Sequence, residues 1–180
     1  MTTFPGTGLG DQLRTVARLI VAWSSFGVKR QVFFCSIAGF DTHSVDQLQD
    51  QGRLLGIVSD AMSAFYRATV ELGVASQVRS FTMSDFGRDL PVNGSGGSDH
   101  GWRNHHLVLG GAVKGKQLYG TFPTLRVNGP DDTSGGRWIP TTATEQYAAA
   151  LGDGFGLNAS EVAQAFPTLN RFAAGALPIY

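Results

Sequence analysis

Apolar side chains in the first seventy residues follow two helical patterns. Over residues 9–26 they recur three and four positions apart, which predicts an amphipathic helix. The same spacing returns after Ser44 and continues to about Leu72. Ser44 and Gln47 have the spacing of a capping box, so we expect them to begin the second helix and Gly73 to end it.

Two shorter apolar runs predict strands on either side of the second helix. Residues 31–38 are rich in β-forming side chains and too few for a helix, which indicates a buried central strand. Residues 78–83 indicate another. A strand, a helix and a strand in succession predict a βαβ unit with parallel strands and a right-handed crossover. Further along, the pattern predicts a short strand at 107–109, a helix over about 143–151, and a last helix from Ser160 to just before Pro167.

These elements predict a single α/β domain over residues 1–180, because no linker and no internal repeat divides the chain. We expect three α/β/α layers with a mostly parallel sheet. The carboxyl ends of parallel strands meet at one sheet edge, where open α/β sheets bind their ligands.

Charge and composition narrow the classes of partner. Fourteen Lys and Arg balance fourteen Asp and Glu, so no field of one sign attracts nucleic acid. No apolar stretch approaches the roughly 20 residues that cross a bilayer. The single cysteine, Cys35, lies in the apolar run at 31–38 and is expected in the core. Many of the 24 glycines fall between residues 87 and 156, which suits ordered loops around a site.

Carboxylates and imidazoles follow both predicted strands. Asp41 and His43 come after the first strand and Asp85 after the second, so the predicted sheet brings them together. The glycine-rich loop that follows adds Asp99, His100, His105 and His106. A mixed oxygen and nitrogen set of this kind suits divalent zinc, and also manganese, iron or calcium. The alternative for His43 alone is a histidine that bonds the backbone of a turn.

Two arginines are candidates for an anionic ligand. A guanidinium holds two anionic oxygens at once, so Arg88, as a catalytic residue, and Arg103, as a substrate-binding residue, are candidates to contact a phosphate or sulfate group. The alternative for both is a structural ion pair. Asn93 is a candidate to orient the substrate, with a turn as its alternative. Trp102 stands in a loop, where it either stacks on a sugar ring or covers the edge of the core.

The succession of motifs resembles the DUF1501 family, a bacterial family similar to sulfatases and alkaline phosphatases. The motifs that carry the resemblance are Gly39-Phe40-Asp41-Thr42-His43, Ser84-Asp85-Phe86-Gly87-Arg88, Ser98-Asp99-His100-Gly101-Trp102 with His105-His106, Leu109-Gly110-Gly111, and Gly136-Arg137-Trp138-Ile139-Pro140-Thr141-Thr142. Family members are longer, so the resemblance implies that this chain matches their carboxyl-terminal part and forms a partial domain.

The resemblance also implies two metal sites of the alkaline phosphatase type. Asp41 and His43 match the Asp and His that bind one ion, with His106 or His105 as the later ligand. The second site uses Asp-His-Gly after another strand, and here phenylalanine stands in the place of that histidine, in Asp85-Phe86-Gly87. Asp99-His100-Gly101 is a candidate to supply the missing imidazole from a loop.

From this resemblance we expect a metal-dependent hydrolase of small anionic phosphate or sulfate esters, whose nucleophile is absent from this chain. The alternatives are an exported metal-binding or structural protein without turnover, and a glycan-binding module that uses the tryptophan loops. The family implies a periplasmic or extracellular parent. A parallel sheet without its first strands exposes an apolar edge, which predicts self-association of the chain.

Overall fold

The computed structural model describes residues 1–173 and 175–180, and it divides the chain into two compact units. Unit 1 comprises Met1–Met83, Pro91–Asp99 and His106–Ala112. Unit 2 comprises Ser84–Leu90, His100–His105 and Val113–Tyr180. That they form a single domain stays a prediction.

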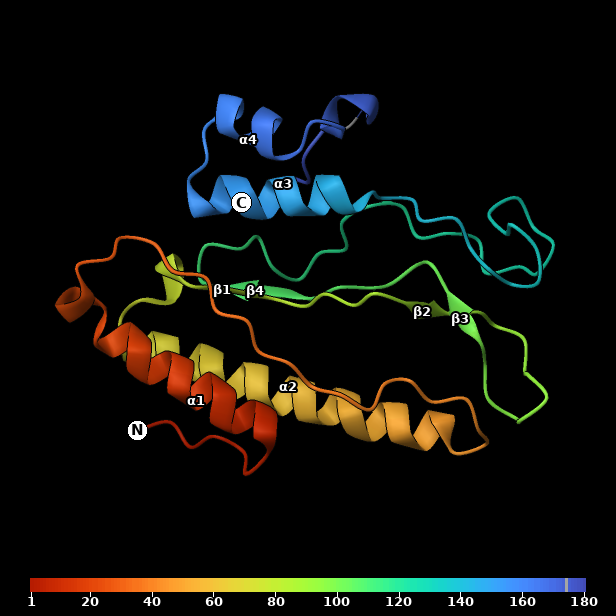
Figure 1. Cartoon of the computed structure of the whole chain (residues 1–180), viewed down its shortest axis with the longest axis horizontal. Helices are drawn as coiled ribbons and strands as arrows, with labels where there is room; N and C mark the ends of the chain where they lie inside the picture. Colours follow the sequence, from red (N-terminus) through yellow and green to blue (C-terminus); the bar gives the residue numbers. More distant parts are fainter. Residues whose placement is uncertain (174) are drawn as a thin grey trace. The chain divides into compact units, whose positions relative to one another are not determined.

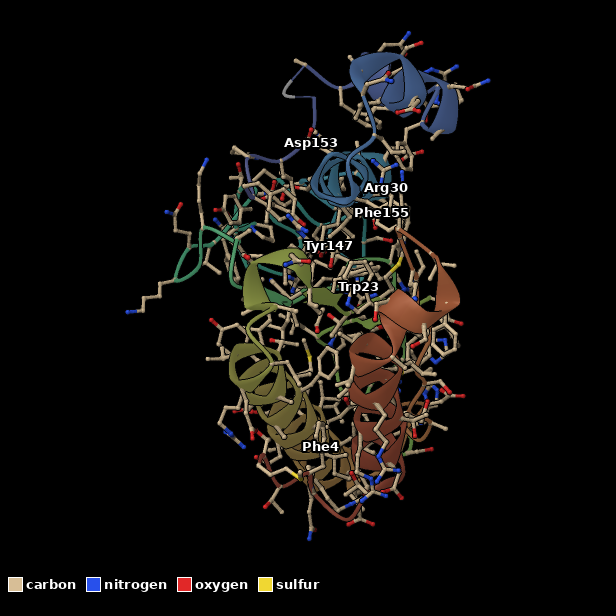
Figure 2. The ribbon with its side chains drawn as sticks, turned by 90° about the vertical axis from the view of Figure 1, so that its left-hand side faces the viewer. Phe4, Trp23, Arg30, Tyr147, Asp153 and Phe155 are labelled. Carbon is tan, nitrogen blue, oxygen red and sulfur yellow. The ribbon has the colours of Figure 1, made fainter. Side chains whose placement is uncertain are left out.

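Unit 1 is built on two packed helices, α1 (Gly8–Val21) and α2 (Gln47–Glu71), which Figure 1 shows side by side. Thr7 caps α1, because its hydroxyl accepts the Gly10 N–H at 3.1 Å. The apolar stripes of both helices meet in two buried clusters, and Phe4 packs against the second (Figure 2). The helical patterns of the sequence are therefore confirmed, except that the first helix ends at Val21 and the 3₁₀ turn η1 (Trp23–Phe26) follows.

The start of α2 differs from the prediction. Asp46 is the N-cap residue, and no side chain caps the helix, so the capping box of Ser44 and Gln47 is wrong. The backbone N–H of Gln47 donates to the Ser44 carbonyl, while the Gln47 side chain contacts Ser98 instead of the helix end. The side-chain amide of Gln47 is thus available to hold a distant loop.

The sheets also differ from the prediction. Among the described residues the strands form two small antiparallel pairs, β1 (Arg79–Phe81) with β4 (Val108–Gly110), and β2 (Gly87–Arg88) with β3 (His100–Gly101). The predicted three-layer α/β/α fold with a mostly parallel sheet is therefore wrong. The βαβ unit is wrong as well, because β1 pairs with a later strand that runs in the opposite direction.

The segment 31–38 shows why the described residues form no parallel sheet. It is not a strand, although Cys35 and Ile37 pack against the helical clusters as a buried strand would. The side-chain amide of Gln12 bonds both the N–H and the C=O of Ser36, each at 2.9 Å. A helix side chain thus takes the place that a neighbouring strand has in a sheet.

Unit 2 contains the β2–β3 pair, a long irregular stretch, and two helices, α3 (Thr144–Phe155) and α4 (Ala159–Ala165). Figure 2 labels Tyr147 and Phe155, which both belong to α3. Tyr147 is buried, and its burial raises the pKa of the phenol far above the ordinary value. Trp138 anchors the irregular stretch, since its side chain is 1% exposed and donates to the Thr124 carbonyl at 2.7 Å.

The short structural elements complete the two units. The 3₁₀ turns η2 (Ala75–Gln77) and η3 (Leu169–Arg171) precede β1 and follow α4. Asn158 caps α4 through the N–H groups of Ser160 and Glu161. Within the described chain, no helix is long and apolar enough to cross a membrane.

Candidate metal centre

Asp41 and His43 lie together in unit 1, as the sequence predicts. The distance between His43 Nε2 and Asp41 Oδ1 is 2.9 Å. Both side chains reach the surface, with 66% of Asp41 and 42% of His43 exposed. A dissolved ion therefore has access to one carboxylate and one imidazole that already face each other.

Helix α2 holds the loop that carries this pair. The side-chain amide of Gln51 donates to the Phe40 carbonyl at 2.8 Å and to the Thr42 hydroxyl at 3.0 Å. Gly39, which precedes the loop, has a φ of 102°, a conformation that side chains other than glycine rarely adopt. The loop thus leaves the 31–38 segment in a sharp turn and is fixed on both sides of Asp41.

Asp99 approaches the opposite nitrogen of the same imidazole. Its Oδ1 lies 3.5 Å from His43 Nδ1, so the ring of His43 stands between two carboxylates. Asn93 holds this arrangement, because its side-chain amide donates to Asp99 Oδ1 at 2.9 Å and to the His43 carbonyl at 3.2 Å. The structure therefore brings together Asp41, His43, Asp99 and Asn93 from two loops of unit 1.

Gln47 fastens the second loop to α2. Its side-chain oxygen accepts the Ser98 N–H, and its side-chain nitrogen donates to the Ser98 hydroxyl at 2.8 Å. Ser44 and Gly96 form an isolated bridge beside these bonds. A Cβ on Gly97 would stand 2.5 Å from the His43 carbonyl carbon, so only glycine allows the loops to approach this closely.

These anchoring residues were missed by the sequence interpretation. Gln47 and Gln51 lie one helical turn apart at the start of α2, and that spacing is the one signal that places both amides on the same face. Their partners, a backbone carbonyl and two hydroxyls among them, leave no motif in the sequence.

The donor set fits a divalent ion on its chemistry. Zinc takes imidazole nitrogen and carboxylate oxygen at about 2.0–2.2 Å in a tetrahedral arrangement, so two ligands of one ion stand roughly 3.4 Å apart. The distance of 2.9 Å between Asp41 Oδ1 and His43 Nε2 is shorter and is that of a hydrogen bond, so a bound ion would take the place of the proton between them. Asp99 reaches the other ring nitrogen, the place of the carboxylate that orients a metal-binding histidine in many metalloproteins.

The other predicted residues make contacts of their own. Arg88 stands opposite His100 in the β2–β3 pair, and the His100 ring stacks on Phe86 with centroids 4.1 Å apart. Arg103 lies over the Trp138 ring, 5.1 Å from its centroid, and burial lowers its pKa. In unit 2, the His105 ring stacks on Phe122, and Asp85 is exposed just before β2, while His106 is exposed in unit 1.

The model of the family DUF1501, described as a protein of unknown function, matches residues 5–137, well over half of the chain. This chain belongs to the DUF1501 family. The matched span includes every residue of the DUF1501 motifs described above except those from Trp138 on, and it covers the whole Asp41, His43 and Asp99 cluster. No curated protein and no solved structure matches the chain.

Proposed function

We propose that this chain is the metal-binding portion of a hydrolase of phosphate or sulfate esters, similar to the alkaline phosphatases and sulfatases. The observation that carries the proposal is the imidazole of His43 between Asp41 and Asp99, 2.9 Å from one carboxylate and 3.5 Å from the other. The resemblance of the Asp41-Thr42-His43 motif to that superfamily supports the same chemistry.

In this proposal each residue of the cluster has its own role. Asp41 and His43 Nε2 hold the ion, and the Asp99 carboxylate, 3.5 Å from His43 Nδ1, favours a proton on Nδ1 so that Nε2 is left for the ion. Asn93 positions Asp99 instead of the substrate. Asp99 is thus an orienting residue, although the sequence pattern favours it as a ligand.

A bound divalent ion supplies charge that stabilises the anionic ester and its leaving oxygen. The protein contributes the placement of the ligands, and Arg88 as the catalytic residue that contacts anionic oxygens stays a prediction from the sequence. Four further metal ligands stay predictions from the sequence, namely Asp85, His100, His105 and His106. Arg103 as a substrate-binding residue stays a prediction as well, and we assign no nucleophile.

Calorimetric titration of the metal-free protein with zinc and with manganese tests the metal site. Asp41→Ala and His43→Ala each remove a proposed ligand, so we expect them to lower the affinity by about a hundredfold or more. Asp50→Ala is the matched control, because Asp50 is also a carboxylate of unit 1 that reaches the surface, and it pairs with Arg53 at 3.6 Å. Equal affinity of the four proteins would contradict the proposal.

A second candidate function is metal binding without turnover. The side chain of Phe86, which stands where the resemblance expects a histidine, stacks on His100 and offers no ligand atom. Hydrolysis of 4-nitrophenyl phosphate and 4-nitrophenyl sulfate by the full-length natural protein separates the two candidates. Metal-dependent release of nitrophenol supports the hydrolase, and tight metal binding with no release supports the second candidate.

A further inference from the structure

The β2–β3 ribbon of unit 2 has two faces of different character. Along residues 86–89 and 100–103 the burial alternates, as it does when successive side chains of a strand point to opposite sides. On the first face, Asp89 is buried beside Arg137, at 3.8 Å, and Arg103 lies over Trp138. This face is therefore packed against the irregular stretch of unit 2.

Two glycines on the packed face let the two strands approach each other closely. A Cβ on Gly101 would stand 2.9 Å from the carbonyl oxygen of Arg88, and one on Gly87 would overlap the carbonyl oxygen of Arg103. Neither position tolerates a side chain, because the two strands lie in close contact. The ribbon is thus a fixed support for whatever its other face carries.

The second face carries aromatic and cationic side chains. Register pairs Arg88 with His100, and directly paired residues project to the same side. Phe86 stacks on His100 at an interplanar angle of 7°, and the Arg88 guanidinium lies 5.1 Å from the Phe86 centroid. Trp102, two positions after His100, belongs to the same face by alternation.

Trp102 differs from the other members of this face in its exposure. Its side chain is 62% exposed, so the alternative in which it covers the edge of the core does not describe it. An indole ring held on a ribbon and open to solvent is suited to stack on a ring of a ligand. The neighbouring Arg88 is suited to hold an anionic group attached to that ring.

We infer that this face, formed by Phe86, Arg88, His100 and Trp102, binds phosphate or sulfate monoesters that carry a ring. Trp102 stacks on the ring, and Arg88 contacts the anionic oxygens. The Phe86 ring contacts both the His100 ring and the Arg88 guanidinium. The inference rests on the proposed function for the class of ester. It adds that the ester oxygen carries a group with a ring.

Titration of the metal-free protein with four probes tests this inference. Phenyl phosphate and glucose 6-phosphate carry an aryl ring and a sugar ring, whereas methyl phosphate and inorganic phosphate carry none. We expect at least one ring-bearing ester to bind about five- to tenfold more tightly than methyl phosphate. Equal binding of all four probes would overturn the inference.

Variants assign the effect to this face. Trp102→Ala should abolish the preference for the ring, whereas Trp102→Phe should keep most of it, because phenylalanine also stacks. Trp23→Ala is the control, since Trp23 is an exposed indole of η1 in unit 1. A ring preference that survives Trp102→Ala, or that Trp23→Ala removes, would also overturn the inference.

Arg88→Gln separates anion binding from stacking. It should weaken the binding of methyl phosphate and of phenyl phosphate by the same factor, at least about fivefold, and leave the ratio of the two affinities unchanged. An unchanged affinity for both would show that Arg88 does not contact the anion. Zinc titration of the same variants distinguishes this inference from the proposed function, because ring-dependent binding without metal binding supports the former and contradicts the latter.

Discussion

The acidic loops of unit 1 and unit 2 differ in what surrounds their carboxylates. In unit 1, Asp41 and Asp99 face the two nitrogens of one imidazole, and each is more than half exposed. In unit 2, Asp132 accepts the backbone N–H groups of Asn128 at 2.7 Å and of Ser134 and Gly136 at 3.0 Å each. The two loops of unit 1 direct their carboxylates to a side chain, and the loop of unit 2 directs its carboxylate to its own backbone.

The difference separates a binding candidate from a structural residue. The bond from the Asn128 N–H, followed by those from Ser134 and Gly136, lowers the pKa of Asp132 and occupies both carboxylate oxygens. The neighbouring Asp131 also accepts a backbone N–H, that of Thr124. Adjacent aspartates in a glycine-rich loop therefore shape a turn here, whereas the more widely spaced Asp41 and Asp99 meet at the imidazole ring of His43.

Among the variants that test this comparison, removal of Asp99 should give the largest loss of metal affinity. Asp99→Ala takes away the acceptor at His43 Nδ1, and loss of such orienting partners costs about ten- to a hundredfold in metal affinity. Asp99→Asn keeps an acceptor without the charge, so its metal affinity should lie between that of Asp99→Ala and that of the natural protein. Calorimetry with zinc measures both.

Asp132→Asn is the control in the loop of unit 2, and its metal affinity should equal that of the natural protein. A loss of affinity in Asp132→Asn as large as that in Asp99→Ala would remove the distinction between the two loops. An unchanged affinity in Asp99→Ala would show that Asp99 does not orient His43.

The helices of this chain could be predicted from its sequence, and the sheet could not. Helical periodicity is a local property, so α1 and α2 appear close to where the apolar spacing places them. The run at 31–38 has the apolar residues of a central strand, and two of them do pack against the helices. Such a run joins a sheet only where another strand bonds its backbone. Here the side chain of Gln12 bonds the backbone of Ser36 instead.

The candidate site shows the same division between local and distant information. Asp41 and His43 could be predicted as a pair because they are two residues apart in one loop. The place of Asp99 at the second nitrogen of His43 could not, because it depends on the bonds of Gln47 to Ser98 and of Asn93 to Asp99. Both bonds join side chains whose types also suit turns and helix ends.

A smaller effect is expected from the glycine that lets the two loops of unit 1 meet. In Gly97→Ala the new Cβ would stand 2.5 Å from the His43 carbonyl carbon and 2.6 Å from Gln47 Oε1, so the loop with Asp99 must shift. We expect metal affinity to fall several-fold, less than in Asp99→Ala, because the carboxylate is displaced and not removed.

Gly94→Ala is the matched control for this substitution. A Cβ on Gly94 meets no atom within 4 Å, so this variant of the same loop should bind zinc as the natural protein does. Calorimetry measures both variants. Equal affinities in Gly97→Ala and Gly94→Ala would show that the approach of the loops does not determine the position of Asp99.

The smallest effect should appear in the stability of unit 2 at acid pH. Because the pKa of Asp132 is lowered in the folded protein, the carboxylate stabilises the fold above the ordinary pKa of aspartate, about 3.9. This contribution is lost as the pH falls through the lowered pKa. Asp132→Asn places an amide against backbone N–H groups, so it should lower the melting temperature at neutral pH.

The two proteins should then converge in acid. Since Asp132→Asn has no carboxylate to protonate, its melting temperature should fall less than that of the natural protein when the pH drops from about 6 to about 3. Thermal unfolding followed by circular dichroism measures this difference, with Asp50→Asn as the control for loss of an exposed carboxylate. Parallel curves for Asp132→Asn and the natural protein would mean that backbone bonds to Asp132 do not stabilise the loop, and the contrast with Asp41 and Asp99 would lose its physical basis.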